Sequence, residues 1–402
     1  MQSLKDFYRI GHGPSSSHTI GPQKAAALFK SRNPDTSYFR ITLYGSLAAA
    51  GKGHFTDQII ENTLKADKIE FLWKPDIIQK YHPNCMLFEA LNNSGEIIAA
   101  WEVYSVGGGQ LREKDRDYSL EKKYSHTSMT KILGWIDKNG KQFWQYVEEN
   151  ESSQIWDFLL ECWTAMQESI IRGIDTEGNL PGGLNLPRKA STFFTKSNNL
   201  NDKLSVHGHV FAYALAVAEE NASGGKIVTA PTCGAAGVVP AVLYSLKTSN
   251  NFSDKKILHA LATAGLFGNM VKHNGSISGA EVGCQGEIGT ACAMASAAVC
   301  QLMGGSPNQI EYAAEMGLEH HLGMTCDPVA GLVQIPCIER NAIAAARAVD
   351  CAIYATLSDG IHKVSFDDVV ETMVKTGRDL NRNYRETSMG GLAEVSMKKQ
   401  KL

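Results

Sequence analysis

GAEVGCQGEIGTACAMASAAVCQLMGGSPNQIEYAAEMGLEHHLGMTCDPVAGLVQIPC (residues 279–337) contains five of the nine cysteines of the chain. Three of the five lie in turns marked by glycine or proline: Cys284, Cys326 and Cys337. A cysteine in an irregular loop can direct its sulfur toward something other than a hydrophobic core. We therefore expect these three thiolates to bind a metal group that takes part in chemistry.

The spacing of these cysteines bears on which metal they bind. Structural zinc sites usually place two cysteines about two to four residues apart, and no two cysteines of this chain are that close. The closely spaced cysteine runs of ferredoxins are absent as well. Three widely separated cysteines suit an iron–sulfur cluster held by the loops of a helical domain. If three thiolates hold a four-iron cluster, one iron stays open as a Lewis acid for a substrate hydroxyl.

Most of the other cysteines are better explained by packing, because a small thiol packs much like alanine. Those predicted to be structural are Cys85, Cys162, Cys292, Cys300 and Cys351. Cys233 lies in a turn and stays open between the two interpretations.

Composition limits the classes of function. The chain has 402 residues, enough for about two or three domains. Its net charge of −3 is spread over both signs, which argues against a nucleic-acid or membrane partner. No apolar window approaches ~18 residues, and the first residues lack the apolar core of a secretory signal. With nine cysteines, we expect a cytoplasmic protein with reduced thiols.

The distribution of helical and strand patterns predicts an α+β fold. Residues 1–148 contain strand patterns at 39–46 and 85–109 among helical segments, and indicate a smaller mixed α/β domain. A polar linker follows at about 148–153. Residues 154–402 form a series of helical segments rich in Ala, Gly and Ser, which indicates a larger all-helical domain that holds the cluster.

The loops supply the candidate substrate-binding residues. The hydroxyl cluster of Ser15, Ser16, Ser17 and Thr19 precedes a helical segment, where it can cap the helix or form an anion site for a substrate carboxylate. His18 in the same cluster can add charge or move a proton.

Two later loops and one further histidine complete the candidates. The glycine-rich turn at 224–237 contains Thr232 and Gly234, and is either a plain connection or a carboxylate site. Asn274 lies in the polar loop that leads to Cys284. His54 lies in a glycine-framed turn before a helical run, and spacing alone does not rank it against His18.

Six ordered segments carry a family resemblance: GPSSSHTIGP, LYGSLAAAGKGH, APTCGAAGVVPAVL, GAEVGCQGEIG, HHLGMTCDPVAGLVQIPCIERN and ETSMGGLAEV. Over nearly its whole length the chain resembles the bacterial iron–sulfur-dependent L-serine dehydratases. It is similar to the single-chain form, in which an N-terminal β part is fused to a helical α part.

The resemblance implies deamination of L-serine to pyruvate and ammonia with a [4Fe–4S] cluster. By position it makes Cys284, Cys326 and Cys337 the cluster ligands and His54 the base that takes the α-proton. It also places the loop from Ser15 to Thr19 near the active site. We expect the active site to lie between the β part and the α part of the chain. We also expect the enzyme to be a homodimer.

One departure from the family concerns the C-terminus. Some single-chain relatives end in a cysteine whose thiolate reaches the fourth iron, whereas this sequence ends in EVSMKKQKL. We therefore expect water or a small anion on the open iron at rest, and a more oxygen-labile cluster.

Three alternatives remain. A pyridoxal-phosphate dehydratase would perform the same reaction, and the triglycine at 107–109 suits a phosphate, but no lysine stands out as its Schiff-base partner. A redox sensor or scaffold would explain the cysteines and leave the Ser, His and Gly loops without a role. A hydro-lyase for another hydroxy acid would use all of these residues.

Overall fold

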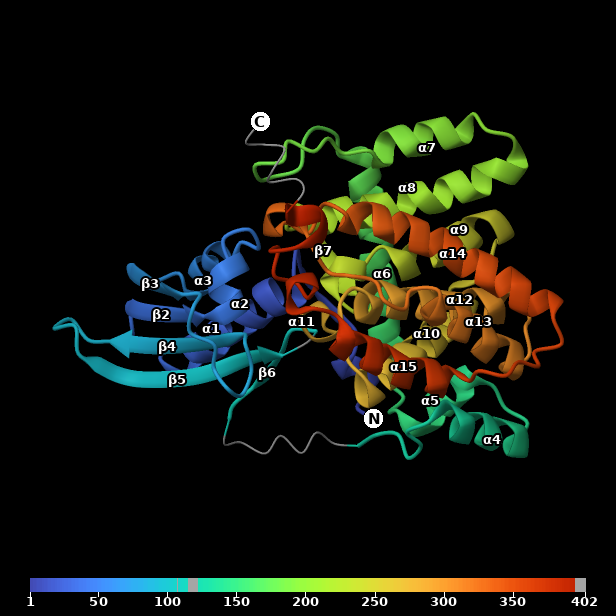
Figure 1. Ribbon diagram of the computed structural model, residues 1–402, viewed down its shortest axis with the longest axis horizontal. Coiled ribbons are helices and arrows are strands. Elements are labelled where there is room, and N and C mark those ends of the chain that lie inside the picture. The colour runs from blue at the N-terminus through green and yellow to red at the C-terminus, as the bar shows by residue number, and fades with distance from the viewer. Residues whose placement is uncertain (107, 115–121, 395–402) are drawn as a thin grey trace.

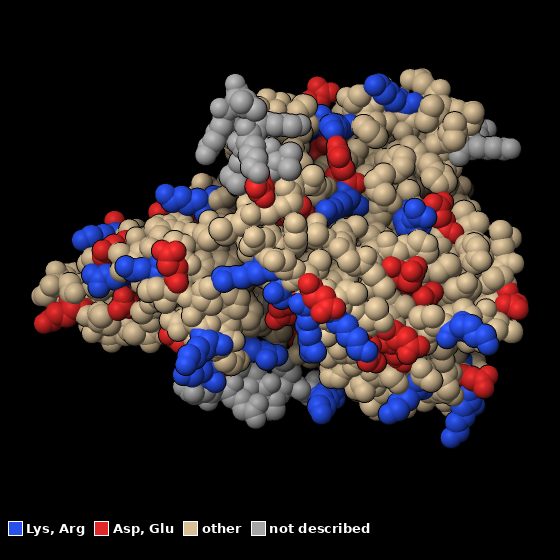
Figure 2. All heavy atoms as spheres, viewed as in Figure 1, with Lys and Arg blue, Asp and Glu red and all other residues tan. Residues whose placement is uncertain are grey.

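The computed structural model describes residues 1–106, 108–114 and 122–394 (Figure 1). They form two lobes: a small lobe (residues 13–114) built around a sheet, and a large helical lobe (residues 1–12 and 122–394). This confirms the α+β class and the order of a mixed domain followed by a helical one. Basic and acidic side chains are interspersed on the face of both lobes that Figure 2 shows. None of the helices in the described ranges combines the length and the apolar character that a membrane crossing requires.

The small lobe contains a five-stranded mixed sheet in the order β3-β2-β4-β5-β6. The strands are β2 (Tyr38–Tyr44), β3 (Lys68–Lys74), β4 (Cys85–Leu91), β5 (Ile97–Val106) and β6 (Gln110–Arg112). β2 and β3 are parallel and joined through α3 (Thr56–Leu64), and the other pairs are antiparallel. Alternate residues of β2 (Phe39, Ile41 and Leu43) are fully buried, and they share a core with α1 (Gly21–Arg32).

The large lobe is a bundle around α12 (Thr290–Leu302), whose residues from Thr290 to Cys300 are all buried. Around it lie α9 (Val238–Asn250), α10 (Asp254–Asn274), α13 (Pro307–Glu319) and α14 (Cys337–Leu357). The outer helices are α4 (Met129–Asn139), α5 (Phe143–Asn150), α6 (Ile155–Asp175), α7 (Ala190–Asn198), α8 (Asp202–Ala222), α11 (Gly279–Val282) and α15 (Phe366–Asp379).

Small residues set how closely these helices approach. Gly317 of α13 packs against the backbone of Ala293 in α12, where an added Cβ would lie 3.0 Å from the backbone nitrogen and Cα. This contact sets the separation of α12 and α13, and α14 packs along α12 in the same core.

The first residues of the chain pack on the large lobe. Strand β1 (Arg9–His12) pairs antiparallel with β7 (Lys226–Thr229), and Tyr8 is fully buried in the helical core. The buried side chains of α4 and α5 belong to the same core. The predicted domain division at about residues 148–154 stays a prediction, although side chains from both sides of it share the larger core.

The close contact at Gly317 yields a stability prediction. Replacing Gly317 by Val should destabilise the protein by about 1–3 kcal/mol, because the added atoms overpack the α12–α13 interface. Gly134 in α4 is the matched control: a Cβ there meets nothing within 4 Å, so G134A should stabilise by about 0.5–1 kcal/mol through helix propensity. Urea unfolding followed by far-ultraviolet circular dichroism measures both. A G317V variant as stable as the wild type would contradict the packing argument.

Candidate active site

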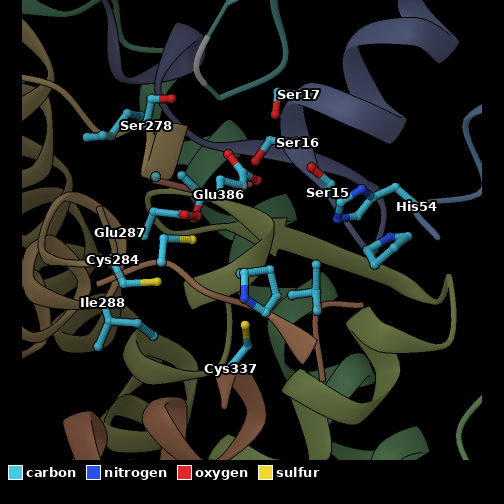
Figure 3. Close-up of a pocket in the computed structure, with 18 of the residues that line it drawn as sticks. Ser15, Ser16, Ser17, His54, Ser278, Cys284, Glu287, Ile288, Cys337 and Glu386 are labelled. Atoms are coloured by element: carbon cyan, nitrogen blue, oxygen red, sulfur yellow. The ribbon is translucent and has the colours of Figure 1, made fainter. Parts of the chain in front are cut away.

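A pocket lies where the two lobes meet (Figure 3). The small lobe contributes Pro14, Ser15, Ser16, Ser17, His54 and Gly108. The large lobe contributes Thr232, Gly234, Ile277, Ser278, Gly279, Cys284, Glu287, Ile288, Cys326, Pro328, Val333, Cys337 and Glu386.

The three loop cysteines converge on this pocket. Cys284 lies in the turn before α12, Cys326 in the loop after α13, and Cys337 is the first residue of α14. All three are free thiols and are at most 8% exposed. The pKa of Cys326 is raised, first by its hydrogen bond with Cys284, and the pKa of Cys337 is raised by burial.

The guanidinium of Arg340 supports the thiol group from α14. Arg340 faces Cys284, donates to the carbonyl of Thr325 at 2.6 Å, and lies 3.6 Å from the carboxylate of Asp327. Three thiols that meet beside a fixed cation form a donor set that soft metals prefer. The raised pKa values of Cys326 and Cys337 mean that these two thiols ionise more readily when a positive charge, such as that of a metal, lies beside them.

The other cysteines lie elsewhere, as predicted. Those that pack in the two lobes are Cys85, Cys162, Cys292, Cys300 and Cys351, each at most 5% exposed. Cys233, left open by the sequence, belongs to the buried core as well, and burial raises the pKa of its thiol to about 12. Its backbone N–H donates to the hydroxyl of Ser16 at 3.0 Å and so ties the two lobes together.

The structure separates the roles of the two histidines. His54 lines the pocket from the turn between α2 (Gly45–Ala50) and α3. Its Nδ1 lies 3.0 Å from the carbonyl of Ala50, and a carbonyl only accepts, so Nδ1 carries the proton. Its buried Nε2 has no hydrogen-bond partner among the described residues. Burial lowers the pKa of His54 to about 4.

His18 lies behind His54, with the two ring centres 4.6 Å apart. Its Nδ1 bonds to Ser17 and its Nε2 to Ser46, both at 3.0 Å, and the side chain is fully buried. Burial and the neighbouring His54 lower the pKa of His18 well below the ordinary value. Both ring nitrogens of His18 are engaged, and the residue is not among those that line the pocket.

The serine-rich turn has hydrogen-bond donors that suit an anion. Ser15 caps the turn, with its hydroxyl accepting from the N–H of His18 at 3.2 Å. The N–H groups of Ser16 and Ser17 donate to no group in the part of the chain that the structure describes, and the turn runs on into α1. Free N–H groups at a helix start bind carboxylates well. Thr19 does not line the pocket, and its hydroxyl instead donates to the carbonyl of His54 at 2.8 Å.

Two carboxylates in the pocket were not singled out from the sequence. Glu287 accepts from the hydroxyl of Thr232, and its pKa is raised by burial. Glu386 lies beside it (Figure 3), and burial followed by the charge of Glu287 raises its pKa to about 8. Both belong to quoted segments, GAEVGCQGEIG and ETSMGGLAEV, but glutamates are common and only burial distinguishes these two.

The placement of Asn274 corrects one prediction. Asn274 is the last residue of α10, is exposed, and donates to the carbonyl of Thr127 at 2.7 Å. It lines a separate surface depression with Asp367 and Lys375. The predicted contact with substrate fails because α10 ends with this side chain turned toward Thr127 instead of toward the thiols.

Comparisons with known proteins fit this arrangement. The sequence model described as "Serine dehydratase beta chain" matches residues 3–70, and that described as "Serine dehydratase alpha chain" matches residues 83–393. The chain is 40% identical to the "L-serine dehydratase" of Streptomyces coelicolor, over 97% of this chain and 98% of that protein. It is 40% identical to "L-serine dehydratase 1" of Escherichia coli, over 98% and 99%, and 36% identical to the Helicobacter pylori protein, over 98% of each.

The environment of His54 yields a titration prediction. The imidazole should stay neutral, with the proton on Nδ1, until the pH falls to about 4. Because the folded state then binds fewer protons than the unfolded chain between pH 4 and 6.5, this group's contribution to stability falls as the pH falls through that range. ¹H–¹⁵N spectra of imidazole-labelled protein, with H54N to assign the signal, measure the pKa. A midpoint near 6.5 would contradict the prediction.

Proposed function

Because the chain belongs to the serine dehydratase family, we propose that it converts L-serine to pyruvate and ammonia as an iron–sulfur L-serine dehydratase. The observation that carries this proposal is a single pocket that is lined by three cysteines, by His54 and by the serine-rich turn. The Nε2 of His54 has no hydrogen-bond partner among the described residues. A dehydration of serine needs a ligand for the hydroxyl, a base for the α-proton and donors for the carboxylate.

The residues present fit a four-iron cluster on Cys284, Cys326 and Cys337. They supply three thiols with access to one space, and Gly279 leaves room beside them, since a Cβ on it would lie 3.0 Å from the sulfur of Cys326. A cluster held there would supply an open iron as Lewis acid for the hydroxyl of the substrate. The expectation that the fourth iron stays open rests on the C-terminal sequence, and residues 395–402 lie outside the described part of the chain.

His54 is the proposed base. Its neutral Nε2 faces the pocket with a free lone pair, and the carbonyl of Ala50 fixes the tautomer. Thr19 holds the backbone of the same residue from the small lobe. Such a positioned base removes the α-proton, which is weakly acidic in the free amino acid. Loss of the β-hydroxyl then gives aminoacrylate, which water converts to pyruvate and ammonia.

The proposed carboxylate site is the serine-rich turn. The free N–H groups of Ser16 and Ser17 face the pocket, with the hydroxyls of Ser15 to Ser17 around them. These donors are fixed before the substrate arrives, so they need no rearrangement as charge develops on the carboxylate during proton removal. Gly234 lines the pocket from the large lobe and is the second proposed contact of the substrate carboxylate.

The alternatives differ in which pocket residues they require. A pyridoxal-phosphate enzyme needs a Schiff-base lysine, and no lysine occurs among the described residues that line the pocket; Gly107 of the triglycine lies outside the described residues. A redox sensor has no need of a tautomer-fixed histidine facing the thiols. The predicted homodimer stays a prediction, to which the exposed apolar residues Tyr354, Leu357 and Ile361 on and after α14 add support.

Anaerobic purification tests the function directly. The protein should show a broad absorption band near ~400 nm and form pyruvate from L-serine, and both should be lost together in air. C326S should lose the band and the activity, whereas the matched control C292S, whose thiol packs in α12, should keep iron and turnover. A sharp pyridoxal-type band with air-stable activity would overturn the proposal.

The two histidines should differ in their effect on turnover. H54N should lower kcat by about 10²–10⁴-fold, with iron content and the cluster band unchanged, because only proton removal is affected. H18N should lower kcat less, since His18 acts by holding the ring of His54. Steady-state pyruvate formation under anaerobic conditions measures both. A larger loss for H18N than for H54N would reverse the assignment of the base.

A further inference from the structure

The pocket contains two half-buried carboxylates that the reaction as described does not use. Glu287 follows Cys284 in the turn before α12, and Glu386 lies in the segment after α15. Figure 3 shows Ser15, Ser16 and His54 on one side of the pocket and Glu287 and Cys284 on the other, with Glu386 between them in this view.

Both carboxylates are held by their surroundings. Glu287 accepts from the Thr232 hydroxyl, and the backbones of Gly234 and Gly279 press against its two oxygens: a Cβ on Gly234 would lie 3.1 Å from Oε2, and one on Gly279 would collide with Oε1. Glu386 has a φ of +56°, a conformation that a side-chain-bearing residue rarely adopts, and its N–H donates to the carbonyl of Cys326 at 2.7 Å.

These two carboxylates lack a cation. Neither forms an ion pair with any lysine or arginine among the described residues. The charge of the Arg340 guanidinium lowers the pKa of Glu287, but this guanidinium pairs with Asp327 and its hydrogen bonds go to Thr325 and Cys284. Buried carboxylates without a cation are costly unless a ligand supplies one.

We propose that Glu287 and Glu386 together bind the ammonium group of the substrate, and so make the pocket select amino acids over hydroxy acids. This inference rests on the proposed function and names the groups that fix its substrate class. The helix start at Ser16 and Ser17 then takes the carboxylate and the thiol side takes the hydroxyl. With three substituents held, the remaining Cα–H bond is directed to Nε2 of His54 for only one hand of the amino acid.

The same geometry allows one other role for Glu287. Its carboxylate oxygen and the sulfurs of Cys284 and Cys326 lie within 4.8 Å of one another, so the carboxylate is close enough to be a metal ligand. A metal ligand and an ammonium receptor predict different effects of the Glu→Gln change: the first alters the metal centre, and the second alters the affinity for one class of ligand.

The test uses E287Q and E386Q as anaerobically prepared holoenzymes. Glutamine keeps the size of the side chain and its acceptor oxygen, and removes only the charge. Each variant should raise the KM for L-serine about 10- to 100-fold. The inhibition constant of 3-hydroxypropionate, which carries the hydroxyl and the carboxylate but no ammonium, should stay the same or decrease. Iron content and the cluster's absorption and electron paramagnetic resonance spectra should match the wild type.

Glu281 on α11 is the matched control. It is an exposed glutamate in the same segment and lies outside the pocket, so E281Q should leave every one of these measurements unchanged. Thermal unfolding of each variant shows whether the fold is intact. E386Q provides a second, independent test at the other carboxylate.

Three results would overturn the proposal. Loss of iron or an altered cluster spectrum in E287Q would assign Glu287 to the metal. Equal weakening of L-serine and 3-hydroxypropionate, or no weakening of either, would show that these carboxylates do not recognise the ammonium. A wild-type enzyme that forms no pyruvate from L-serine would overturn the proposed function itself. If the wild type forms pyruvate but the variants do not bind L-serine and 3-hydroxypropionate differently, only this inference is overturned.

Discussion

Close packing of α12 against α13 and α14 is the constraint on which the rest of the structure depends. Small residues on these helices, such as Gly317 and Ala293, let the backbones approach closely. The turn before α12 carries Cys284, and α14 begins at Cys337. Since both helices share one core, their starts meet at one point and bring together two thiols that are remote in sequence. The loop after α13 adds Cys326 at the same point.

The small lobe brings the groups that the helical lobe lacks. Its serine-rich turn is joined to the large lobe by the bond from the Cys233 N–H to Ser16. Its second turn contains His54, next to Gly53, whose added Cβ would lie 3.4 Å from the carbonyl of Gly331. The thiols and the unpartnered histidine nitrogen therefore come from different lobes, and the complete site exists only when the lobes are docked. This division explains why the pocket lies at the junction instead of inside either core.

The sequence identified the residues whose local context is unusual and missed those whose context is ordinary. Three cysteines in Gly/Pro turns differ from cysteines in Ala-rich helices, so Cys284 and Cys292 were separated without a structure. Spacing did not rank His54 against His18, and only the family resemblance favoured His54, because their difference lies in which ring nitrogen lacks a partner. Glu287 was missed because burial alone distinguishes it. Asn274 was placed wrongly because closeness in sequence to Cys284 does not set the direction of its side chain.

The same electrostatic argument applies to both proposed ligands of the pocket, the metal on the thiols and the ammonium group beside the carboxylates. The thiols of Cys326 and Cys337 and the carboxyls of Glu287 and Glu386 have raised pKa values even with Arg340 beside them. The first cause is the hydrogen bond with Cys284 for Cys326, and burial for the other three groups. A metal bound to the thiols lets them ionise, and a cationic group beside the carboxylates lets these ionise in turn. Binding of a metal and ionisation of the thiols therefore favour each other, and so do binding of a cationic group and ionisation of the carboxyls. Under the proposed function, the free-energy cost of ionising these groups in the pocket is offset when a metal binds the thiols and an ammonium group binds the carboxylates.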